Sequence, residues 1–190
     1  LIQLSKNPKY WEANQVKLEQ ISVSLIQDSM TAYRMYEKGE LDFIGTPFTA
    51  IPTDIVDELS KDHVLHTQAI AGTQILSLNT LSPPLNNVNF RKALFHACNR
   101  EQIIKGACQQ KEIPAASLVP PILGGLNIKA PSSQPMLARA YLDIALMEME
   151  TTVDKIGPLH LCYAAPGAND KIAIILQEQI KKTLNIDLIL

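Results

Sequence analysis

Segments with the hydrophobic spacing of strands alternate along this chain with segments that have the spacing of helices. The order of these segments constrains the fold more than any other feature. Residues 16–25 alternate apolar and polar side chains, a pattern typical of a half-buried strand with a bulge. Residues 28–38 have helical character, and Asp28 or Ser29 is suited to cap their first turn. Gly39 suits the left-handed position that ends a helix. This alternation predicts an α/β fold, because each helical crossover is long enough to join parallel strands.

The rest of the chain continues this order. Further strands are predicted at residues 1–4, 41–44, 63–71, 73–79, 159–164 and 186–190. Further helices are predicted at residues 54–60, 87–97, 101–106, 136–149 and 171–184, and Asn87 or Asn89 is suited to cap the second of these. A proline-rich irregular loop is expected at residues 111–135, and a turn at residues 165–170. We expect one α/β lobe over residues 1–190, a mixed sheet flanked by helices, because no linker-like break separates two parts that could each bury a core.

Composition excludes several classes of protein. A chain with 46% hydrophobic and 19% charged residues is not intrinsically disordered. The net charge of −2, without a cluster of Lys and Arg, argues against a nucleic-acid binder. Three cysteines without a C-x-x-C motif make neither a disulfide scaffold nor a zinc ribbon. The longest stretch without charged residues, 63–90, contains Gln, Asn and a Pro pair, so we expect no membrane span.

No residue constellation specifies a reaction. Phosphate-binding, nucleophile-elbow and zinc-protease motifs are all absent from the sequence. His63 and His66 fall on opposite faces of a predicted strand, so no metal site is expected. Cys162 lies in an apolar strand, where a buried, inert thiol is the preferred interpretation. His160 would share the face of Cys162, which leaves a cysteine-dependent hydrolase as an alternative to a binding protein.

Several segments together resemble the peptide-binding proteins of bacterial ABC importers, a family that takes oligopeptides, dipeptides and nickel chelates. The resemblance is carried by Leu4-Ser5-Lys6-Asn7-Pro8-Lys9-Tyr10-Trp11, by Gly39-Glu40-Leu41-Asp42, and by Asn79 with Pro83-Pro84-Leu85-Asn86-Asn87-Val88-Asn89-Phe90-Arg91-Lys92-Ala93-Leu94. It continues through Asn99-Arg100, the loop from Pro114 to Pro121 and Asn185-Ile186-Asp187-Leu188. Asn87 and Asn99 stand where the family usually has Asp, and Asn185 where it has Gly. Asn caps helices and tolerates the left-handed conformation, so the fold is unaffected.

The resemblance implies a two-lobed protein that encloses its ligand, of which this chain is most of the second lobe, truncated at both ends. It implies a short peptide ligand, delivery to an ABC permease in the membrane, no cofactor, and a periplasmic or extracytoplasmic monomer with or without a lipid anchor. The same fold binding another solute, such as a metal chelate, haem or a cell-wall peptide, is the alternative within the family.

Three segments are the expected ligand contacts. The turn Gly45-Thr46-Pro47-Phe48 follows a predicted strand and resembles the family segment that lies along the bound peptide. In the strand from Thr73, alternation places Thr73, Ile75 and Ser77 toward the ligand and Gln74, Leu76 and Leu78 toward the core. In the turn before the last helix, Asn169 is the expected polar contact, with capping of that helix as its structural alternative.

Overall fold

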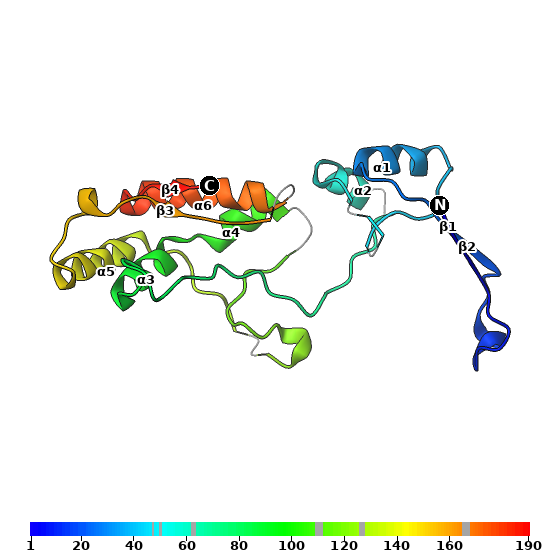
Figure 1. The fold of residues 1–190 in the computed structure, drawn as a ribbon, viewed down its shortest axis with the longest axis horizontal. Helices are drawn as coiled ribbons and strands as arrows, with labels where there is room; N and C mark the ends of the chain where they lie inside the picture. Colours follow the sequence, from blue (N-terminus) through cyan, green and yellow to red (C-terminus); the bar gives the residue numbers. More distant parts are fainter. Residues whose placement is uncertain (47, 50, 62–63, 109–111, 126–127, 165–167) are drawn as a thin grey trace. The chain divides into compact units, whose positions relative to one another are not determined.

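The computed structural model divides the chain into two compact units, Leu1–Leu59 and Ser60–Leu190, each of which is described by itself (Figure 1). The structure describes residues 1–46, 48–49, 51–61, 64–108, 112–125, 128–164 and 168–190. Within these residues, no helix has both the length and the apolar character needed to cross a bilayer. The expectation of one lobe over residues 1–190 stays a prediction.

The first unit begins with an antiparallel hairpin of β1 (Ile2–Ser5) and β2 (Gln20–Val23). Directly opposite pairs such as Leu4 and Ile21 place apolar side chains on one face of this hairpin. Helix α1 (Ser29–Glu37) follows, and a 3-10 turn (Thr53–Ile55) leads into α2 (Val56–Lys61), within which the first unit ends at Leu59.

The ends of α1 are fixed by the residues that the sequence indicated. The Asp28 carboxylate accepts a hydrogen bond from the Thr31 backbone N–H at 2.7 Å, so Asp28 is the cap. The hydrogen bond from the Thr31 hydroxyl, together with this backbone bond, holds the pKa of Asp28 below its usual range. Gly39 has a φ of +73° and ends the helix, as predicted.

The second unit is built from helices. It contains α3 (Val88–Ala97), α4 (Arg100–Ile103) running into a π-helical turn (Ile104–Cys108), α5 (Pro135–Glu148) and α6 (Ala168–Leu184). Short 3-10 turns lie at Pro121–Leu123 and Val153–Lys155. Strands β3 (Leu159–His160) and β4 (Leu188–Ile189) form a parallel pair beside α6 (Figure 1).

One apolar core holds this unit together. Helices α3 and α5 lie side by side, and both contact α6. The three helices contribute buried side chains at helical spacing, and the segment around β4 contributes two more. These core residues are Phe90, Ala93, Leu94, Ala97, Ala138, Leu142, Ala145, Leu176, Ile180, Leu184, Ile186 and Leu188. The buried Gln179 amide pins α6 to the start of α4, because it accepts from Asn99 N at 2.9 Å and donates to Asn99 O at 3.2 Å.

The strand predictions were only partly right. The fold class is α/β, but the described residues of 41–44 and 64–79 form no strand, and β3 is shorter than the predicted 159–164. A strand exists only where a neighbour completes its backbone hydrogen bonds. Within the described part of the chain, no backbone group of residues 64–78 pairs with another backbone group. These segments therefore have extended-chain sequences without a partner among the described residues.

Candidate functional site

The first expected contact segment is a tight turn in the first unit. Gly45 is buried, and its carbonyl oxygen accepts from the N–H groups of Phe48 and Thr49, both at 3.0 Å. Its φ of +126° is a backbone conformation that side chains disfavour, although a Cβ there would meet only ordinary contacts. Thr46 and Phe48 are exposed, and the expected contact Pro47 lies outside the described residues. This turn therefore presents side chains to solvent, as a contact segment must.

An aromatic pair flanks this turn. The rings of Phe43 and Phe48 meet edge to face, with centroids 6.4 Å apart, and the two residues are 61% and 62% exposed. Exposed aromatic side chains beside a turn are suited to pack on an apolar ligand group. The sequence prediction included Phe48 as a contact but not Phe43, which it assigned to a short strand. The sequence feature that could have indicated Phe43 is its position two residues before Gly45, next to the expected contact turn.

The second segment, around Thr73–Ser77, is extended and exposed. Ile75 is 58% exposed, Ser77 is exposed and Thr73 is half-buried. On the opposite side of the alternation only Leu78 packs against the core, since Gln74 is exposed and Leu76 is 42% exposed. The exposure of Ile75 and Ser77 is therefore compatible with the expectation that they face a ligand, although the segment is not a strand.

Asn169 lies in the first turn of α6, not in a turn before it. Its side chain is half-buried, and its Nδ2 donates to the carbonyl oxygen of Ala164 at 2.9 Å. Residues 165–167 lie outside the described residues. This bond ties the helix start to the preceding segment, so the amide N–H has a structural partner. Contact of Asn169 with a ligand stays a prediction.

The expected contact residues are divided between the two units. The described ones in Leu1–Leu59 are Gly45, Thr46 and Phe48, and those in Ser60–Leu190 are Thr73, Ile75, Ser77 and Asn169. A common binding cleft for all of them is therefore an inference from the family resemblance.

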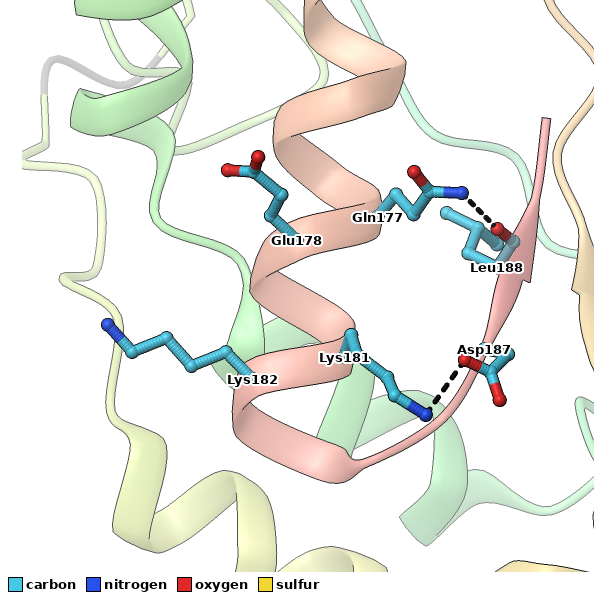
Figure 2. Close-up of a pocket in the computed structure, with 6 residues that line it drawn as sticks. All are labelled: Gln177, Glu178, Lys181, Lys182, Asp187 and Leu188. Atoms are coloured by element: carbon cyan, nitrogen blue, oxygen red, sulfur yellow. Dashed lines mark hydrogen bonds and ion pairs between the residues drawn. The ribbon is translucent and has the colours of Figure 1, made fainter.

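A separate hollow lies between α6 and β4, lined by Gln177, Glu178, Lys181, Lys182, Asp187 and Leu188 (Figure 2). Lys181 Nζ pairs with Asp187 Oδ1 at 2.8 Å, and Gln177 Nε2 donates to the Leu188 carbonyl oxygen at 2.6 Å. These two bonds join α6 to the β4 segment, so Gln177, Lys181 and Asp187 have a structural role. None of the expected contact residues lines this hollow.

The cysteines differ from the sequence interpretation in one respect. Cys98 and Cys162 are free thiols. Burial raises the pKa of Cys98, although the nearby Arg100 partly opposes that effect. Cys162 is exposed, so the prediction of a buried thiol was wrong. Strand β3 ends at His160. Beyond it, Leu161 still donates to the Ile189 carbonyl oxygen at 2.8 Å and packs against the core, whereas residues 162–164 are exposed.

The described residues contain no candidate metal site. Within the described ranges, no group of three His, Cys, Asp or Glu side chains is placed to hold a metal ion. His66 is exposed, and His63 lies outside the described residues.

Comparison with known proteins connects this geometry to a family. Residues 1–190 match the family described as "Bacterial extracellular solute-binding proteins, family 5 Middle". The chain is 35% identical over 191 residues to the oligopeptide-binding protein OppA of Bacillus subtilis (strain 168), which covers 98% of this chain and 35% of that protein.

Two solved structures show the same fold. The periplasmic oligopeptide-binding protein OppAIV from Borrelia burgdorferi has a TM-score of 0.78 and 29% identity, covering 98% of this chain and 36% of that one. NikA from Brucella suis, in complex with Fe(III)-EDTA, has a TM-score of 0.71 and 28% identity, covering 90% of this chain and 36% of that one.

The chain thus spans about a third of the length of the relatives that it matches. Its α/β architecture is that of one part of a two-lobed periplasmic binding protein. The family match extends over residues 1–190 and is supported by a relative at 35% identity. The chain belongs to family 5 of the bacterial extracellular solute-binding proteins.

Proposed function

We propose that this protein is the substrate-binding component of an ABC importer, that it binds short peptides between two lobes, and that it delivers them to the membrane permease. The observation that carries the proposal is the family match over residues 1–190, together with similarity to oligopeptide-binding relatives. The fold by itself would not identify a ligand, since one fold hosts many functions.

The geometry supports a peptide as the ligand. Residues 64–78 form neither helix nor strand, and within the described chain their backbone groups have no backbone partners. An extended peptide can complete such a segment with main-chain hydrogen bonds, which give affinity without requiring a particular ligand sequence. Ile75 and Ser77 would then face the ligand, and water would fill the space around variable ligand side chains.

The first unit would contribute the turn at Gly45 and the aromatic pair Phe43 and Phe48. Their edge-to-face contact presents ring faces and edges on which an apolar ligand side chain can pack. Closure of the two lobes around the peptide would exclude bulk water from both segments. We propose an extracytoplasmic monomer without a cofactor.

The experiment that tests this function is calorimetry of the full-length protein with a mixed tri- to pentapeptide library, preceded by mass spectrometry of any ligand that co-purifies. We expect micromolar or tighter binding, which corresponds to about −8 kcal/mol or better. Residues 1–190 alone should bind at millimolar concentration or more weakly, because they supply only part of the cleft. No heat of binding with the full-length protein would contradict the proposal.

A metal chelate is the second candidate, and one observation favours it. The similar NikA structure holds Fe(III)-EDTA, at 28% identity to this chain. Calorimetry with nickel and iron chelates, in the presence and absence of peptide, separates the two candidates. Tighter binding of a chelate than of any peptide in the library would replace the first proposal with the second.

A further inference from the structure

The parallel pair of β3 and β4 has two outer edges, which the directions of its backbone groups define. Leu159 N donates to the Asp187 carbonyl oxygen at 2.9 Å, and Leu161 N donates to the Ile189 carbonyl oxygen at 2.8 Å. Successive residues of a strand point their N–H and carbonyl groups to opposite sides. On each strand, the residue between these two positions therefore points its backbone groups to an outer edge of the sheet.

The outer edge of β4 is covered by side chains of α6. Leu188 faces this edge, and its carbonyl oxygen accepts from Gln177 Nε2 at 2.6 Å (Figure 2). One residue earlier, the Asp187 carboxylate pairs with Lys181 Nζ at 2.8 Å. Charged side chains and a covering helix commonly protect an edge strand from pairing with another chain. Gln177 therefore occupies the acceptor that a further strand would need on this side.

The outer edge of β3 has no such cover within the described residues. Among them, no backbone group of His160 or Cys162 bonds to another backbone group, and both side chains are exposed. Residues 159–164 contain no Lys, Arg, Asp, Glu or Pro, whereas charged residues and Pro often protect an open edge. The strand itself is held in place, because Leu159 and Leu161 pack against the core. This edge is therefore fixed in position and open to a further strand.

The cover of this edge has to be permanent, which narrows the choice of partner. Parallel sheets occur almost only with both faces covered, yet Ile189 on the outer face of this pair is 44% exposed. An open edge promotes aggregation, and a ligand that binds and leaves would not cover it continuously. This chain covers only 35% of OppA from Bacillus subtilis and 36% of OppAIV, so proteins of this kind have further chain to supply a strand. The remainder of the same polypeptide is therefore the partner that fits.

We propose that a strand from the part of the polypeptide outside residues 1–190 pairs with β3 at His160 and Cys162, and that Gln177 keeps β4 as the outer edge of the sheet. The sheet then grows in one direction only, away from α6 and its contacts with β4. This inference concerns the assembly of the protein itself, so it does not depend on the proposed function or on the ligand.

Amide hydrogen exchange of the full-length protein, resolved to single residues, tests which edge is paired. The His160 and Cys162 amides should exchange within about tenfold of the rate of Leu161, whose amide is already bonded to the β4 segment. Leu190 is the control for the other edge, since its N–H points the same way as that of Leu188, and it should exchange much faster. Fast exchange at His160 and Cys162 overturns the proposal. Slow exchange at Leu190 overturns the assignment of β4 as the outer edge.

The same measurement identifies the partner. Slow exchange at His160 should not depend on protein concentration or on added peptide, because the partner strand belongs to the same molecule. Slow exchange that appears only at high protein concentration would identify a second copy as the partner. Slow exchange that appears only with peptide would identify the ligand, and either result overturns the proposal.

A pair of variants in the full-length protein tests the role of Gln177. Gln177→Ala frees the Leu188 carbonyl oxygen, so this variant should self-associate at a protein concentration about tenfold lower than the wild type does, measured by sedimentation velocity. Glu178→Ala is the matched control, because Glu178 lines the same hollow but takes no part in the two bonds between α6 and the β4 segment. Equal self-association of the two variants overturns the role of Gln177. Exchange at His160 in the wild type decides the β3 edge even where Gln177→Ala does not fold.

Discussion

Helix α3 and the segment 64–79 belong to the same compact unit, but they are held in different ways. Helix α3 completes its own backbone hydrogen bonds, is capped by Asn87 and buries Phe90 completely. The described residues of segment 64–79 lack backbone partners over residues 64–78, and most of their side chains are exposed. Only Leu78, near the end of the segment, packs against the core that α3 helps to form.

This difference suggests separate roles within the second unit, with α3 serving stability and residues 64–79 serving ligand binding. A helix needs a buried stripe and two caps, all of which lie close together in the sequence. An extended segment needs a partner strand, which another part of the polypeptide or a bound peptide can supply. We therefore expect substitutions in α3 to act on folding, and substitutions in residues 64–79 to act on ligand binding.

The largest expected effect comes from Phe90→Ala. Phe90 is 0% exposed, and removing its ring leaves a cavity in the core, which typically costs about 3–5 kcal/mol. Thermal and urea unfolding of the full-length protein measure this loss. Val88→Ala is the control on the same helix, since Val88 is 49% exposed and should change stability little. Similar losses in both variants would show that α3 is buried differently.

Ile75→Lys tests the other side of the comparison. Ile75 is 58% exposed and makes no core contact, so the variant should keep the melting temperature of the wild type. We expect peptide affinity, measured by calorimetry, to fall about tenfold, which corresponds to about 1.4 kcal/mol. Leu78→Ala is the matched variant and should lower the melting temperature with little change in affinity. Unchanged affinity for Ile75→Lys would remove this segment from the binding site.

Most of the helical architecture could be predicted from the sequence because the signals are local. The caps Asp28 and Asn87 and the left-handed Gly39 were confirmed at or within one residue of the expected positions. The start of α6 was placed too late, at residue 171 instead of Ala168. Asn169 was therefore expected in a turn, whereas it lies in the first turn of the helix.

The strands and the site were harder to predict because strand pairing depends on segments that are far apart in the sequence. Alternation predicted a core face of Gln74, Leu76 and Leu78, but only Leu78 packs against the core, and alternation does not indicate where a partner strand would come from. The exposure of Cys162 and Phe43 has the same origin. Each lies in a segment predicted to be a strand, but in the described part of the chain neither residue belongs to one.

Asn87→Ala should have an intermediate effect. The Asn87 side chain accepts from Phe90 N at 3.0 Å, and loss of such a cap typically costs about 0.5–2 kcal/mol. Its Nδ2 also donates to Glu148 at 2.8 Å, which links the start of α3 to the end of α5. Asn89→Ala is the control, because Asn89 donates to Glu148 but does not cap the helix. Urea unfolding should show the larger loss for Asn87→Ala, and equal losses would argue against the cap.

The smallest effect is a pH dependence at Glu148, on the α5 side of this link. Hydrogen bonds from Asn87 and Asn89 hold the pKa of Glu148 below its ordinary range. A carboxyl group with a lowered pKa in the folded state adds stability above its unfolded pKa of about 4.3, and loses that contribution as the pH falls through the folded value. The wild type should therefore exceed Glu148→Gln in unfolding free energy at pH 7, and this difference should shrink toward pH 3. The same comparison in an Asn87→Ala, Asn89→Ala background removes the donors, so its pH dependence should disappear. A difference that stays constant from pH 7 to pH 3 would mean that the amide groups do not stabilise the charged form, and that α3 and α5 are joined by their apolar contacts alone.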